Sequence, residues 1–160
     1  MGYIIAYLAA IVAANLSVAH FGPASMPINA FLLIGFDLTA RDGLHEAWRE
    51  DGLFWKMAAL IAAGSGLSWA LNAAAGPIAL ASLVAFAAAG VTDWLVYSRL
   101  VDETQLVRMN GSNLASAAVD SVVFPTLAFG ALMPGVVLAQ YVAKVGGGAM
   151  WAWLLTRVRA

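Results

Sequence analysis

The chain contains no cysteine, so it can form neither a disulfide nor a thiolate metal site. Charged residues are also scarce, at 11% of the chain against about 25% in ordinary soluble domains. A net charge of −1 without any basic stripe argues against a nucleic-acid partner. The one glycine run, Gly146-Gly147-Gly148, lacks the following Lys and Ser or Thr of a phosphate-binding loop. We therefore expect no cofactor, no metal and no ATP hydrolysis by this chain alone.

Apolar residues make up 62% of the chain. A soluble domain of 160 residues could not bury that much apolar surface. Most of the apolar runs have about the 17–25 residues that a helix needs to cross the ~30 Å hydrocarbon core of a membrane. We therefore expect an all-α polytopic membrane protein, a bundle of six transmembrane helices forming one domain over residues 1–160. The six runs are residues 3–20, 28–39, 54–71, 78–98, 114–131 and 136–156.

The positive charges are distributed unevenly between the connections. The first, third and fifth connections are broken by proline and glycine, predict tight hairpins and hold no cation. Cations near helix ends mark the cytoplasmic side, so both termini are expected in the cytoplasm of a bacterial cell and the protein in its inner membrane. The second and fourth connections and the C-terminus hold Arg41, Arg49, Lys56, Arg99, Arg108, Arg157 and Arg159.

The second run is short and continues into a polar stretch. Asp37, Arg41 and His45 are four residues apart, so they would share one face of a helix. One interpretation is an amphipathic extension held together by ion pairs along its surface. The other is that Asp37 and Arg41 line the inner mouth, or gate, of a pathway through the membrane.

Polar residues near the middle of apolar runs must find partners in the protein interior. For Asn15 and Gln140, a role in holding helices together and a role in ligand binding remain equally open. For Asp93, Asp120 and Lys144 we favour a functional role, although an Asp–Lys pair could serve assembly alone. Lys144 is expected in the interior, close to Asp120 or Asp93. An excess of carboxylates there would suit a cation, a hydrogen-bond-rich ligand or a proton.

One segment carries a specific likeness. Ser112-Asn113, followed by Asp120-Ser121 and Phe124, resembles the hallmark of the queuosine-precursor transporters, also called the vitamin uptake transporter family. The acidic stretch after the second run, Asp93 with Tyr97, and Lys144 are similar to polar positions of that family. The likeness extends over essentially the whole chain.

The resemblance implies uptake of a 7-deazaguanine, such as its 7-cyano or 7-aminomethyl form, and no enzymatic activity. A carboxylate can accept the donor edge of a guanine-like ring, amides can read its carbonyl and ring nitrogens, and aromatic rings can cover its face. The alternatives are a substrate-binding subunit of an energised uptake complex, a membrane enzyme and a purely structural protein. The lipid bilayer is an expected partner, and association between copies of the chain is left open. The candidate substrate-binding residues are Asn15, Phe86, Asp93, Asn113, Asp120, Phe124, Gln140 and Lys144.

Overall fold

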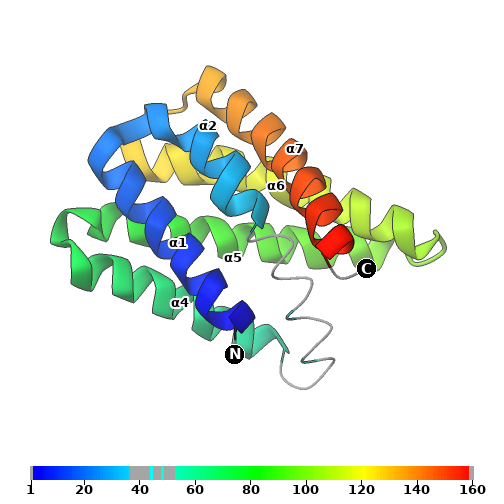
Figure 1. The fold of residues 1–160 in the computed structure, drawn as a ribbon. Coiled ribbons are helices and arrows are strands. Elements are labelled where there is room, and N and C mark those ends of the chain that lie inside the picture. Colours follow the sequence, from blue (N-terminus) through cyan, green and yellow to red (C-terminus); the bar gives the residue numbers. More distant parts are fainter. Residues whose placement is uncertain (1, 37–43, 45–47, 49–52, 159–160) are drawn as a thin grey trace.

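The computed structural model describes residues 2–36, 44, 48 and 53–158, and within them every regular element is helical. The longest of these helices pack side by side or cross one another (Figure 1). Leucine and alanine, which favour helices, are frequent in all of them, and proline near the start of α5 fits the first turn. The five longest are α1 (Gly2–Phe21), α4 (Leu53–Leu71), α5 (Gly76–Arg99), α6 (Gln105–Phe129) and α7 (Pro134–Val158).

The second apolar run forms short helical pieces. A 3₁₀ turn (Gly22–Ser25) is followed by the four-residue α2 (Met26–Asn29) and by a π-helical segment, η2 (Ala30–Ile34). Gly22 has φ +68°, a left-handed conformation that glycine adopts without strain and that turns the chain back along α1. The π-helical hydrogen bonding is visible where Gly35 N–H donates to the carbonyl of Ala30, five residues earlier.

The prediction of six membrane-spanning helices is therefore wrong in its count. The described residues contain five long helices, and the described part of the second apolar run forms the short helical pieces given above. Within the described part of the chain, two stretches qualify by length and composition as candidate membrane spans, Ile4–Ile34 and Ala73–Arg99. The first of them includes the chain reversal at Gly22, so it comprises α1 and the helical pieces after it.

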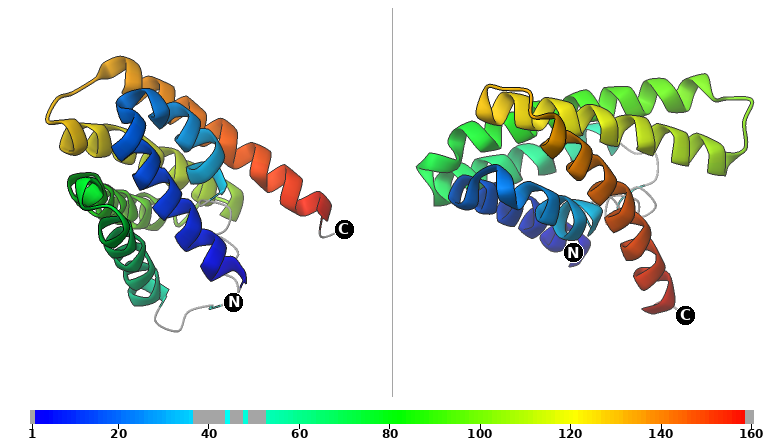
Figure 2. Two further views of the ribbon diagram at one scale, coloured as in Figure 1. Left: turned by 60° about the vertical axis from the view of Figure 1, so that its left-hand side comes forward. Right: turned by 90° about the horizontal axis from the view of Figure 1, so that it is seen from above.

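The predicted hairpins at the three uncharged connections are confirmed. The 3₁₀ turn Gly22–Ser25, a second one at Ala73–Ala75 and the turn after Gly130 each join helices that pack against each other. Asn72 caps the second turn by accepting a hydrogen bond from Ala74 N–H at 3.0 Å, and Gly130 ends α6 with φ +70°. All three turns lie at one end of the molecule, while the α5–α6 connection and both ends of the described chain lie toward the other (Figures 1 and 2).

Small residues dominate the interfaces between helices. Without a hydrophobic drive between helices in lipid, small side chains allow the close approach that makes packing favourable. Large apolar side chains instead point outward, as Trp55, Trp69 and Trp94 do at 64–74% exposure. A chain with this distribution presents an apolar exterior and a tightly packed, small-residue interior. The buried alanines are Ala10, Ala14, Ala30, Ala75, Ala79, Ala81, Ala85, Ala89 and Ala117.

A close backbone contact joins α7 to η2 and to Gly35, which follows it. A Cβ added to Gly147 would lie 2.1 Å from the backbone oxygen of Phe31, and one added to Gly35 would lie 2.6 Å from the backbone of Gly147. Trp151, one turn further along α7, donates its indole N–H to the carbonyl of Leu32 at 2.9 Å. The glycine run in α7 is thus a close-packing site, and the helix continues through it without unwinding.

Gly147→Ala is expected to lower the stability of the folded protein by about 1–3 kcal/mol or more, because the new methyl group meets backbone that cannot rotate away. The matched control is Gly146→Ala, whose added Cβ meets only the Phe31 side chain at 3.6 Å. The control should keep or raise the melting temperature, since alanine favours a helix more than glycine does. Thermal unfolding of the two purified variants in detergent measures the difference; equal melting temperatures would contradict the close contact.

Candidate functional site

A cavity lies between the N-terminal helices and the helices α5, α6 and α7. The empty space between its walls is about 420 Å³, part of it open to the surroundings. Apolar side chains form most of the wall, and a few polar groups interrupt it. Its lining residues are Ile11, Ala14, Asn15, Val18, Met26, Asn29, Ala30, Ile34, Ser82, Phe86, Asp120, Phe124, Gln140 and Lys144.

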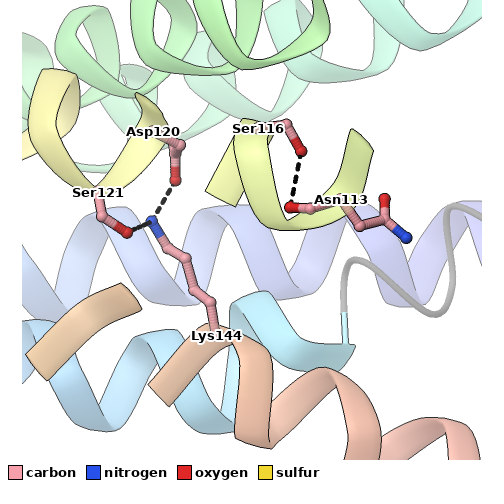
Figure 3. Close-up of polar contacts among 5 residues, drawn as sticks. All are labelled: Asn113, Ser116, Asp120, Ser121 and Lys144. Atoms are coloured by element: carbon pink, nitrogen blue, oxygen red, sulfur yellow. Dashed lines mark hydrogen bonds and ion pairs between the residues drawn. The ribbon is translucent and has the colours of Figure 1, made fainter. Parts of the chain in front are cut away.

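An ion pair between Lys144 of α7 and Asp120 of α6 lies in this wall (Figure 3). Lys144 is 2% exposed and Asp120 is 9% exposed. The ammonium group also donates to the hydroxyl of Ser121 at 3.2 Å, which satisfies a second of its three donors. Asp120 is one of the two partners predicted for Lys144. Because both groups are buried, each charge needs the other to offset the cost of removing it from water.

The local sequence of α6 shapes this contact. Pro125, fully buried near the C-terminal end of the helix, has no N–H to donate to the carbonyl of Ser121 one turn earlier. The backbone next to Asp120 is therefore released from one helical hydrogen bond at the level of the ion pair. The same helix places Phe124 one turn beyond Asp120, on the face that lines the cavity.

Three amide side chains join the wall. Asn15 of α1 donates to the hydroxyl of Ser68 at 3.1 Å, and that hydroxyl donates in turn to the carbonyl of Gly64 at 2.7 Å. Gln140 of α7 is 2% exposed, and its Nε2 is buried without a hydrogen-bond partner in the described part of the chain. The amide nitrogen of Asn29 lies 3.5 Å from the Ala14 carbonyl and 3.5 Å from the Ser25 hydroxyl, both long contacts.

The structure therefore brings six of the eight candidate binding residues to one cavity. Those six are Asn15, Phe86, Asp120, Phe124, Gln140 and Lys144.

Asp93 and Asn113 are the two candidates outside the cavity lining. Asp93 lies half-buried on α5, and its Oδ1 atom has no hydrogen-bond partner among the described residues. The side chain of Asn113 points away from Asp120 in Figure 3, and its main-chain carbonyl accepts a hydrogen bond from Ser116 at 3.1 Å. The proposed gate, Asp37 and Arg41, lies outside the described residues.

These placements change the expected charge of the site. With Asp93 outside the cavity, the described lining contains one lysine and one aspartate, whose formal charges cancel. The predicted excess of negative charge is not found in this lining. The arrangement can pair with a neutral ligand through amides and aromatic rings, while the ion pair offers both a cation and a carboxylate to its polar edge.

Two polar lining residues, Asn29 and Ser82, were not among the sequence-based candidates. Both are buried, at 8% and 7% exposure. Asn29 interrupts an apolar run near its start, so the argument that selected Asn15 also applies to it. Ser82 carried no such signal, because buried serines usually bond their own helix backbone.

Residues 52–158, two thirds of the chain, match the protein family described as "Putative vitamin uptake transporter". The chain belongs to this family. The vitamin uptake transporters are membrane proteins, in agreement with the apolar helices of this chain. The matched range contains Asp120, Gln140 and Lys144, while α1 and α2 lie before it. No curated protein and no solved structure matches the chain.

Lys144→Met is expected to destabilise the protein by about 3–5 kcal/mol, because it leaves the buried carboxylate of Asp120 unpaired. Adding Asp120→Asn should recover most of that loss, since the double variant buries no lone charge. Exposed Arg99 provides the control, and Arg99→Met should change stability by less than about 0.5 kcal/mol. Melting temperatures in detergent give the comparison. A double variant no more stable than Lys144→Met would show that the charges do not depend on each other.

Proposed function

We propose that this vitamin uptake transporter imports a 7-deazaguanine precursor of queuosine through the cavity around Lys144 and Asp120. The observation that carries the proposal is the composition of the wall. A buried ion pair, three amides and two phenylalanines meet in a space otherwise bounded by aliphatic side chains. This combination suits a flat heteroaromatic molecule with several donors and acceptors along its edges. In this proposal the whole chain acts as one transport domain.

The aromatic and carboxylate groups have complementary tasks in the proposed complex. Phe86 of α5 and Phe124 of α6 supply apolar ring surface for the face of the ligand. The Asp120 carboxylate accepts N–H groups of the guanine-like edge, exchanging part of its contact with Lys144 for contact with the ligand. The unpartnered amide nitrogen of Gln140 donates to a carbonyl or ring nitrogen.

The balance of charge favours the neutral 7-cyano form over the cationic 7-aminomethyl form. In the described lining, Lys144 already neutralises Asp120. An additional ammonium group would enter an apolar cavity with no second carboxylate in this lining to offset its desolvation. A neutral nitrile avoids that cost. We therefore take 7-cyano-7-deazaguanine as the first substrate to test.

Proteoliposomes that contain this chain alone should accumulate labelled 7-cyano-7-deazaguanine. Asp120→Asn is expected to lower uptake by at least about tenfold, because it removes a charge-assisted hydrogen bond to the ligand. The stabilised double variant Lys144→Met with Asp120→Asn should remain equally inactive, which separates function from folding. Asp102→Asn, in the exposed α5–α6 connection, is the control and should transport normally.

The outcomes distinguish the candidate functions. Binding without uptake, with uptake restored by an ATP-hydrolysing partner, would make the chain a substrate-binding subunit of an energised complex. Absence of binding to both deazaguanines would overturn the proposed substrate. Full uptake by the double variant would show that the ion pair serves assembly only.

We further propose that the protein lies in the inner membrane with its charged end in the cytoplasm. The three turns without cations share one end of the molecule, and the end opposite carries the α5–α6 connection with Arg99 and Arg108 on its flanks. The positive-inside rule then assigns the chain termini and this connection to the cytoplasmic side.

Single cysteines can test this orientation directly, since the chain has none of its own. Ala74→Cys and Leu132→Cys, both at exposed positions of the uncharged turns, should react with a membrane-impermeant thiol reagent added outside intact cells. Asp102→Cys, exposed in the α5–α6 connection, should react only after the membrane is opened. The reverse pattern of labelling would invert the orientation, and labelling of all three from outside would exclude it.

A further inference from the structure

Ser68 of α4 is not part of the cavity lining, yet it contacts a residue that is. Its side chain is fully buried at 0% exposure. The hydroxyl lies 2.7 Å from the carbonyl of Gly64, one turn earlier on the same helix, and 3.1 Å from the amide nitrogen of Asn15. A serine in a helix commonly donates to the carbonyl four residues before it.

This geometry fixes which way the Asn15 amide points. A hydroxyl group can donate one hydrogen bond. Here the Gly64 carbonyl accepts that bond, because a carbonyl oxygen cannot donate. The Ser68 oxygen can then only accept from Asn15, so the NH₂ group of Asn15 must face Ser68. The remaining polar atom of Asn15, its carbonyl oxygen, is the one left for the cavity.

We propose that Ser68 is a positioning residue that makes the α1 wall of the cavity a hydrogen-bond acceptor. A ligand in the cavity must then present an N–H or O–H group to Asn15. Gln140 instead presents a hydrogen-bond donor. Its buried Nε2 has no partner among the described residues and requires an acceptor from the ligand. The cavity thus selects a ligand that carries both a donor and an acceptor, and Ser68 determines the first of these requirements.

A neighbouring residue provides a matched control. Ser65 lies on the same helix, is also buried at 7% exposure, and its hydroxyl has no hydrogen-bond partner in the described part of the chain. Ser65→Ala and Ser68→Ala remove the same group from similar surroundings, but only the second releases Asn15. Ser68→Cys fills the space of the hydroxyl with a thiol that bonds only weakly, and it guards against an effect of lost volume.

The first measurement needs no ligand. The side-chain NH₂ protons of ¹⁵N-labelled asparagine are followed by NMR in detergent, with the Asn15 signal assigned from its loss in Asn15→Ala. Hydrogen exchange of this NH₂ group should be slow in the parent protein and in Ser65→Ala, and at least about tenfold faster in Ser68→Ala and Ser68→Cys. Unchanged exchange in both Ser68 variants would overturn the proposed hydrogen bond.

The second measurement concerns selectivity and rests on the proposed function. Binding of 7-cyano-7-deazaguanine is compared with binding of derivatives methylated at one nitrogen at a time. The parent and Ser65→Ala should reject at least one derivative by about tenfold or more, and Ser68→Ala should lose that discrimination because its Asn15 is free to turn. If Ser68→Ala discriminates as Ser65→Ala does, the specificity role is wrong. If the parent binds no deazaguanine, the proposed substrate fails while the exchange measurement still decides the role of Ser68.

Discussion

The buried ion pair between Lys144 and Asp120 is the contact on which the arrangement of the cavity depends. An isolated charge at this depth would cost several kcal/mol, and Lys144 is too far along α7 to reach either end of the helix easily. Pairing therefore fixes the register of α7 against α6. Gln140 precedes Lys144 by four residues and Phe124 follows Asp120 by four, so the same register turns both toward the cavity.

Helix α7 is held on a second side by contacts of a different kind. There the backbone of Gly147 lies against that of Phe31, and Trp151 donates to the carbonyl of Leu32. The close backbone contact leaves no room for a side chain at the crossing point, whereas the ion pair requires a charged side chain on each helix. One helix thus combines a steric constraint toward η2 with an electrostatic constraint toward α6, and the cavity lies between the two partners. Ala30 and Ile34 of η2 contribute to its wall.

Much of this site was predictable because charge burial is a strong local rule. Lys144 and Asp120 stand out in apolar runs, and their mutual need for a partner predicted their contact without knowledge of the fold. Proline and glycine likewise predicted the three turns. Asp93 also stands in an apolar run, and the same rule selected it, yet it lies outside the cavity lining. The rule indicates that a buried carboxylate needs a polar partner, but it does not indicate where in the fold that partner lies.

Other features depend on tertiary structure alone. The contact between Gly35 and Gly147 joins residues 112 positions apart, and neither carries a side chain that could indicate a partner. The second apolar run was predicted as one of six helices, and nothing in its residue types indicated the π-helical course of Ala30–Ile34. Ser82 lines the cavity because of its position on α5. Its residue type gave no indication of this role, because many serines in helices bond only to their own backbone.

The shortness of the turns at the uncharged end has a consequence for gating. The turns are 3₁₀ segments of four and three residues at Gly22–Ser25 and Ala73–Ala75, and a short stretch around Gly130. Such segments are too short to fold over an opening and retract from it. In the proposed transport function, access to the cavity from this end therefore requires tilting or sliding of the helices themselves, in the manner of shear motions between packed helices.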